Sequence, residues 1–163
     1  MKPSRHLNVP PRVLEWAYRA TAAVLQPFKR WLRPGGLMER AFVAAERATK
    51  GPLFDCRMCG QCVLHSTGMI CPMTCPKNLR NGPCGGVRAN GHCEVIPEMP
   101  CVWVQAWERA QAMPHFGREF VDVLPPLNRQ LEDTSAWIND LAGLADKNQR
   151  GWVPAASIFI PLK

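Results

Sequence analysis

Several common features are missing from this chain of 163 residues, and each absence argues against a class of protein. No run of eighteen apolar residues occurs, so the sequence predicts no membrane-spanning helix. The basic N-terminal stretch lacks the continuous apolar core and small-residue cleavage site of a secretory signal, which favours a cytoplasmic location. No Gly-x-Gly-x-x-Gly motif, phosphate loop or Ser/His/Asp grouping is present. We therefore expect no catalytic residue and no nucleotide- or flavin-binding residue in this chain.

Acidic residues are nearly absent from the first 33 residues, where Glu15 is the single acid. The seven basic residues of this segment are Lys2, Arg5, Arg12, Arg19, Lys29, Arg30 and Arg33. They give it a net charge of +6 within a chain of net charge +7, so the remainder is nearly neutral. A basic arm of this kind suits nucleic acid, an anionic membrane face or an acidic protein patch. Aromatic residues do not alternate with the basic ones as in single-strand-binding proteins, so nucleic acid is not expected.

Within this basic arm the spacing predicts an amphipathic helix over residues 12–32. Pro10–Pro11 precede the helix, the run 33–36 stops it, and Pro27 ends or kinks it early. Its apolar stripe is Leu14, Ala17, Tyr18, Val24, Leu25, Phe28 and Leu32. Such helices pack on a partner or on their own core more often than on a membrane, so we expect no membrane contact.

Cysteine is confined to residues 56–101, which hold all eight cysteines of the chain. They are Cys56, Cys59, Cys62, Cys71, Cys75, Cys84, Cys93 and Cys101. Three cysteines spaced as Cys56-x-x-Cys59-x-x-Cys62 are typical of iron–sulfur proteins, where they bind three corners of a cube and a fourth ligand comes from elsewhere. Eight thiolates are the number that two such clusters need. The segment therefore predicts a metal-binding centre, with two [4Fe-4S] clusters as the first interpretation.

Three alternatives to two clusters remain open at this point. Zinc also binds Cys-x-x-Cys pairs, although its sites usually use two separated pairs. One cluster combined with a zinc ion or with structural thiols is the second alternative. Disulfides are the third, and the missing secretory signal weakens it.

Other residues of the cysteine-rich segment are weaker candidates for a role at the metal. His65 and His92 are expected to be hydrogen-bonding neighbours rather than ligands. Gly85–Gly86 either bring backbone amides close to a cluster sulfur or form a plain turn. Lys77, Arg80 and Arg88 either offset the negative charge of a cluster, contact a partner or lie in solvent.

The sequence as a whole predicts a small, irregular, metal-stapled (iron–sulfur) centre flanked by α-helices and extended arms, mainly α plus coil. A second helix is expected over residues 37–49, ended by Gly51–Pro52, a third between Cys101 and Pro114, and a fourth over 127–144. The apolar tail 152–162 is expected to be docked. Three parts follow from this division: a basic helical arm (1–50), a cysteine-rich cluster-binding domain (51–101), and a helical region with an extended tail (102–163).

Residues 52–108 resemble the cysteine-rich domain called methylenetetrahydrofolate reductase C-terminal. The resemblance rests on the string STGMICPMTCPKNLRNGPCGG at residues 66–86, with CRMCGQC before it and PEMPCVW after it. The same domain is the small iron–sulfur partner subunit of two-subunit methylenetetrahydrofolate reductases.

The resemblance implies that the eight cysteines are cluster ligands and that this chain is one subunit of a heteromeric oxidoreductase of one-carbon metabolism. A separate (β/α)₈-barrel subunit would hold the flavin, FAD or FMN, and the folate. This chain would transfer electrons to that barrel or support it structurally, without catalysing the reaction itself. The alternative is a structural zinc- or cluster-binding module that stabilises a one-carbon enzyme and has no redox role.

Overall fold

The computed structural model describes residues 9–147, and this part of the chain is helical and coil, as predicted. It contains no strand, only isolated antiparallel bridges between Val87 and Cys93 and between His92 and Pro100. No helix in these residues is both long and apolar enough to cross a membrane. The elements are α1 (Pro11–Leu25), η2 (Gln26–Phe28), α2 (Glu39–Phe54), η3 (Pro72–Thr74), α3 (Val102–Ala110), η4 (Gly117–Val121), η5 (Arg129–Leu131) and α4 (Ala136–Leu141). The predicted docking of the tail 152–162 lies outside the described residues.

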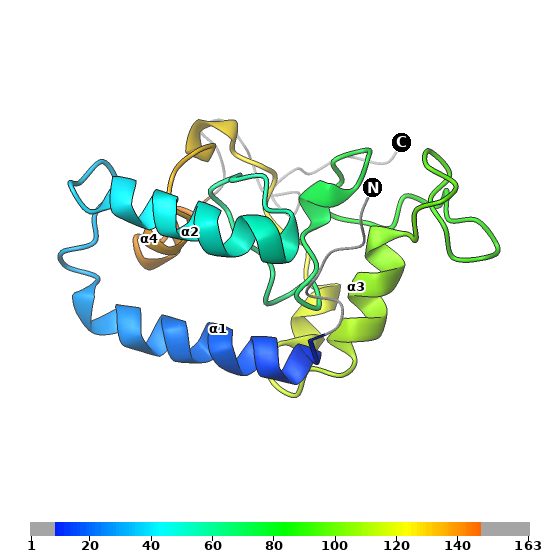
Figure 1. Cartoon of the computed structure of the whole chain (residues 1–163), viewed down its shortest axis with the longest axis horizontal. Coiled ribbons are helices and arrows are strands. Elements are labelled where there is room, and N and C mark those ends of the chain that lie inside the picture. Colours follow the sequence, from blue (N-terminus) through cyan, green and yellow to red (C-terminus); the bar gives the residue numbers. More distant parts are fainter. Residues whose placement is uncertain (1–8, 148–163) are drawn as a thin grey trace, which may run out of the picture.

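Helix α1 confirms the helix predicted in the basic arm and runs along one long edge of the molecule (Figure 1). Pro11 occupies the first turn, where a missing N–H costs nothing, and Pro27 falls in η2, where the α-helix has ended. The side chain of Glu15 is buried, and its Oε1 accepts hydrogen bonds from the backbone N–H groups of His115 (2.9 Å) and Phe116 (2.7 Å). This carboxylate ties α1 to the segment that follows α3.

The predicted apolar stripe of this arm is only partly buried. Leu14 and Tyr18 pack against the core and Leu32 is buried, whereas Val24 near the end of α1 and Phe28 in η2 are exposed. The stripe therefore meets the core along only part of its length.

Helix α2 runs past the predicted end at Gly51–Pro52 and stops at Phe54. Proline removes one backbone hydrogen bond, but burial of Phe54 in the core cluster keeps the last turn helical. Asp55 then adopts a left-handed conformation (φ 50°) and donates its N–H to the Gly51 carbonyl at 2.9 Å. Cys56 therefore directly follows the C-terminal cap of α2.

The third predicted helix is confirmed as α3, but the fourth is not a continuous helix over 127–144. Two short helices form there because two side chains cap separate N-termini. Asn128 accepts from the N–H of Gln130 at 3.0 Å and begins η5, and Ser135 accepts from the N–H of Ile138 at 3.3 Å and begins α4. Asp133, with φ 60°, adopts a left-handed conformation between the two helices and interrupts the helical backbone.

Two hydrophobic clusters form the core. The larger contains Phe54, Leu64, Met69, Cys71, Met73 and Met113. Leu14 and Tyr18 from α1 and Phe116 from the segment after α3 pack against it, so it joins distant parts of the chain. The smaller contains Ile70, Cys75, Val102 and Ala106 and lies against α3. Cysteines occur in both clusters, so the core and the candidate metal centre share side chains.

The loop 56–62 is fixed by contacts with the C-terminal half of the described chain. Gly60 has φ 71°, and a Cβ at this position would collide with the carbonyl oxygen of Leu131. The carbonyl of Gly60 accepts from Asn139 Nδ2 at 2.8 Å, and the carbonyl of Met58 accepts from the N–H of Asp133 at 2.8 Å. Gln61, fully buried, donates Nε2 to the Ala145 carbonyl at 2.8 Å.

We expect Gly60→Ala to lower the free energy of unfolding by about 2–4 kcal/mol, because it adds a steric collision to the strain of a left-handed backbone. Gly143→Ala is the matched control, since Gly143 also has positive φ (66°) but no atom lies within 4 Å of its added Cβ. The control should cost about 1–2 kcal/mol. Denaturant unfolding followed by circular dichroism measures both, and equal losses would contradict the close approach at Gly60.

Candidate metal centre

Backbone geometry gathers the three cysteines of the Cys-x-x-Cys-x-x-Cys motif. Three residues in left-handed conformation, Asp55 (φ 50°), Met58 (φ 50°) and Gly60 (φ 71°), turn the chain sharply before and between these cysteines. The N–H of Met58 points to Cys56 Sγ at 3.4 Å. Backbone N–H groups aimed at sulfur stabilise thiolates bound to a metal. The motif is therefore held as a compact loop, as its spacing predicts.

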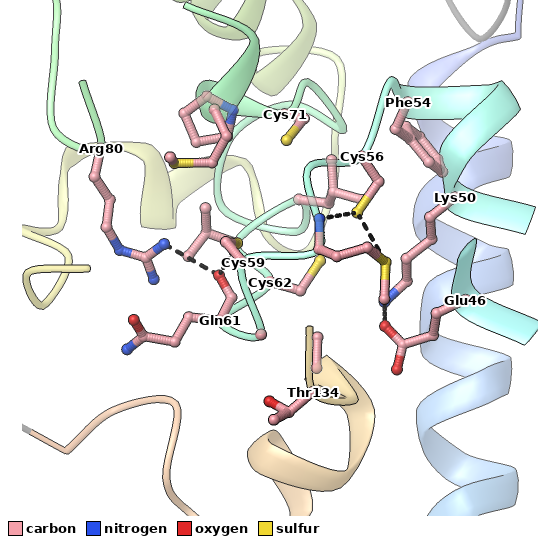
Figure 2. Close-up of a pocket in the computed structure, with 17 residues that line it drawn as sticks. Glu46, Lys50, Phe54, Cys56, Cys59, Gln61, Cys62, Cys71, Arg80 and Thr134 are labelled. Carbon is pink, nitrogen blue, oxygen red and sulfur yellow. Dashed lines mark hydrogen bonds and ion pairs between the residues drawn. The ribbon is translucent and has the colours of Figure 1, made fainter. Parts of the chain in front are cut away.

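A fourth cysteine joins this loop from the next segment. Cys71, at the start of η3, lines the same pocket as Cys56, Cys59 and Cys62 (Figure 2). Burial, followed by the neighbouring Cys56 and Cys62, raises the pKa of Cys71 to about 12. Burial also raises the pKa of Cys56 and of Cys59, and Cys62 adds to both shifts. The four thiols are thus close enough to repel one another as thiolates, and all would need a nearby positive charge.

Two buried cations supply positive charge at this pocket. Lys50 from α2 and Arg80 from the loop after η3 reach toward the cysteines from opposite sides (Figure 2). Burial by itself lowers the pKa of Lys50, but Cys62 and Glu46 outweigh it, so the pKa is raised and the ammonium stays charged. Burial lowers the pKa of Arg80 and the cysteine sulfurs oppose that shift. A guanidinium remains protonated in proteins even so.

The two cations are held differently. Lys50 Nζ lies 2.6 Å from Glu46 Oε2, and the other oxygen of Glu46 accepts from Ser135 Oγ (2.5 Å) and the N–H of Trp137 (3.2 Å). Arg80 instead donates to the carbonyls of Gln61 (3.1 Å) and Pro125 (2.8 Å). No carboxylate between residues 9 and 147 lies within ion-pair distance of Arg80. The pocket therefore has an excess of buried positive charge that thiolates would balance.

The other four cysteines do not share one pocket in the described structure. Cys75 is buried within the smaller core cluster and Cys101 is also buried, whereas Cys93 is half-buried and Cys84 is exposed. Cys93 and Cys101 lie on one short ribbon, in which the Cys93 N–H donates to Met99 and the Cys101 N–H to Gly91, both at 2.9 Å. A hydrogen bond to Glu94, and then the sulfurs of Cys84 and Cys93, raise the pKa of Lys77. These contacts relate Cys84, Cys93 and Cys101 to one region, and they do not include Cys75.

The described residues supply thiol groups that could bind a metal, but these thiols are not arranged in a coordination geometry. Among residues 9–147, no three Cys, His, Asp or Glu side chains stand in metal-coordinating geometry. All eight cysteines fall in this range and are free thiols. Four soft sulfur donors with two buried cations nevertheless fit a four-thiolate ion or cluster. The helical and coil part of the predicted fold class is confirmed, and the metal staple stays a prediction.

The structure also shows the contacts of the weaker candidates from the sequence, His65, His92 and the Gly85–Gly86 pair. His65 stacks on Tyr18 (ring centroids 5.2 Å apart), and His92 Nδ1 lies 2.7 Å from the Pro97 carbonyl. The N–H of Gly86 points to Cys84 Sγ at 3.4 Å, which favours the amide-to-sulfur interpretation of the glycine pair. Lys50 was not predicted, although a Glu-x-x-x-Lys pair directly before Cys56 was a usable signal.

A cysteine-rich helical protein with a four-thiol, cation-lined pocket is the class that fold and site define. Residues 36–130 match the family model described as methylene-tetrahydrofolate reductase C terminal. The match spans more than half of the chain, so the chain belongs to this family, as the resemblance over 52–108 predicted. Neither the curated proteins nor the solved structures include a significant match. The matched range contains all eight cysteines and leaves α1 outside.

We expect Glu46→Gln to lower the free energy of unfolding by about 3–5 kcal/mol, because it leaves the buried Lys50 without its carboxylate. Glu132→Gln is the matched control, since it removes one partner of the exposed Arg129–Glu132 pair (2.7 Å). The control should change stability by less than about 1 kcal/mol. Chemical denaturation measures both, and equal effects would contradict a buried ion pair at the pocket.

Proposed function

We propose that this protein is the iron–sulfur subunit of a flavin-dependent methylenetetrahydrofolate reductase complex. The observation that carries the proposal is the convergence of Cys56, Cys59, Cys62 and Cys71 on one pocket with two buried cations. Membership of the reductase C-terminal family supports the choice of enzyme. The chain itself supplies no catalytic residue in this proposal.

The first centre is a [4Fe-4S] cluster held by these four cysteines. A bound cluster would supply one-electron transfer between a donor and the flavin. Lys50 and Arg80 would offset the negative charge of the four thiolates, and the N–H of Met58 would donate to Cys56. The apolar wall of Phe54, Leu64 and Met73 would limit access of water to the sulfurs.

A second cluster is proposed at Cys75, Cys84, Cys93 and Cys101. The ribbon contacts of Cys93 and Cys101 and the position of Lys77 beside Cys84 and Cys93 support this grouping. Because Cys84 is exposed, this centre would lie nearer the surface than the first, where an electron donor would have access.

The flavin and the folate would be bound by a separate (β/α)₈-barrel subunit. A barrel of this kind takes about 250 residues, more than this chain contains, and residues 9–147 provide no strand for one. In the complex, hydride transfer through the flavin would interconvert methylenetetrahydrofolate and methyltetrahydrofolate. The alternative function is a structural module, with zinc or a cluster, that stabilises the barrel without moving electrons.

The metal content of anaerobically purified protein tests the centre. We expect about eight iron and eight sulfide per chain, and Cys62→Ala should reduce both to about four because it removes one ligand of the first cluster. Cys84→Ala is the comparison variant and should lose the second cluster while keeping the first. Iron and sulfide assays with electron paramagnetic resonance give the result. Zinc without iron would exclude the redox function, and full iron in Cys62→Ala would exclude this ligand set.

Co-expression tests the proposed partner. The chain expressed alone should be poorly soluble, and co-expression with a methylenetetrahydrofolate reductase barrel subunit from the same organism should restore solubility and give a stable complex. Size-exclusion chromatography of the co-purified proteins measures this. A well-behaved isolated monomer that does not bind the barrel would contradict the subunit proposal.

A further inference from the structure

Helix α1 and the short segment that follows it, up to Trp31, leave large apolar side chains exposed to solvent. Val13, Trp16, Val24, Phe28 and Trp31 recur about every three or four residues, or at twice that spacing, and are all exposed. The first three lie on α1, Phe28 ends η2 and Trp31 lies in the turn after it. We call these five residues the outer ridge. Trp16 is 70% exposed, Val24 65% and Trp31 80%, although Leu14 and Tyr18 on the same helix pack into the core. Five large apolar side chains exposed along one segment indicate a binding surface.

The charge around the outer ridge has a single sign. Five exposed cations lie on the same segment: Arg12, Arg19, Lys29, Arg30 and Arg33. The only acid between residues 9 and 38 is Glu15, and it is 1% exposed and turned toward the segment after α3. No carboxylate in the described residues forms an ion pair with any of the five cations. An anionic surface is therefore the electrostatic complement of this segment.

We propose that the outer ridge docks on an anionic lipid bilayer, with α1 lying parallel to the membrane plane. Tryptophan and phenylalanine on an apolar side, with arginine and lysine beside it, are typical of helices that lie in the membrane interface. Trp16 and Trp31 would enter the headgroup region near either end of the ridge, and the arginines would contact lipid phosphates.

A bilayer fits the shape of this surface better than a second protein does. A stable protein interface takes about 20–30 residues on each side, whereas the outer ridge is five side chains along α1 and the turn that follows it. An amphipathic helix needs no more than such a line to bind a membrane. α1 also runs along an edge of the molecule, so that it is accessible to a flat surface (Figure 1). The expectation of no membrane contact rested on such helices packing more often on a partner or on their own core, whereas Val24 and Phe28 of the predicted stripe are exposed.

The position of α1 separates this surface from the metal centre. The family match begins at residue 36, after the outer ridge, and contains every cysteine. Membrane docking would be an addition to the shared domain, independent of the metal bound there.

Vesicle binding by the full-length, metal-loaded chain tests the proposal. On a density gradient, the protein should float with vesicles of equal parts phosphatidylglycerol and phosphatidylcholine, whereas aggregated protein pellets. It should float far less with pure phosphatidylcholine vesicles, and it should detach as salt is raised. The Trp16→Ser/Trp31→Ser double variant and the Arg19→Glu/Arg30→Glu double variant should each bind about tenfold or more weakly. Val121→Ser/Val123→Ser removes two exposed valines elsewhere and should bind like the wild type. Far-UV circular dichroism and iron content confirm that each variant is folded.

Absence of binding to the anionic vesicles, equal binding to both vesicle types, or unchanged binding in the two ridge variants would overturn the proposal. The complex with the barrel subunit should still bind the anionic vesicles. If the barrel or a second copy of the chain instead blocks vesicle binding, and the tryptophan variant abolishes that association, the ridge is a protein interface and the membrane proposal is wrong.

Discussion

The contacts that hold the loop 56–62 against residues 131–145, called the clamp below, are the constraint on which the rest of the structure depends. Gly60 lets this loop pass directly against the backbone of Leu131, and the buried amides of Gln61 and Asn139 satisfy polar groups on both sides. A polar group buried without a partner costs about 1–3 kcal/mol, so this loop can be buried only in its paired arrangement. The clamp holds three cysteines between α2 and the C-terminal half of the chain, where Cys71 and the two cations can reach them.

Charge balance then links the stability of the fold to its chemistry. The buried thiols are difficult to ionise by themselves, since burial raises the pKa of Cys56, Cys59 and Cys71. A buried cation is costly without a partner, and among the described residues Lys50 pairs with Glu46 whereas Arg80 pairs with no carboxylate. Under the proposed function, a metal bound by the four thiolates would bring the two sets together, and metal binding would then be coupled to folding. The Glu46–Ser135 contact joins this electrostatic network to α4.

Helix α1 shows how one element can serve two surfaces. Glu15 and Tyr18 attach its inner side to the core, whereas the outer ridge faces solvent with five cations beside it. The family domain begins after this helix. The shared centre and the added arm therefore carry different properties, electron transfer in the one and membrane contact in the other under the functions proposed above.

The sequence by itself determined the elements that depend on local chemistry. Pro10–Pro11 and Pro27 set the limits of α1, and the Cys-x-x-Cys-x-x-Cys spacing formed a compact thiol loop, because capping and short-range spacing act within a few residues. The same local rules failed at Phe54, whose burial carried α2 past Pro52, and at Ser135, whose cap divided a predicted helix. Only the tertiary structure decided that Cys71 joins the first three cysteines, that Lys50 and Arg80 face them, and that Val24 and Phe28 face solvent. Those outcomes depend on contacts between segments far apart in the chain, and residue spacing carries no information about which distant surfaces will meet.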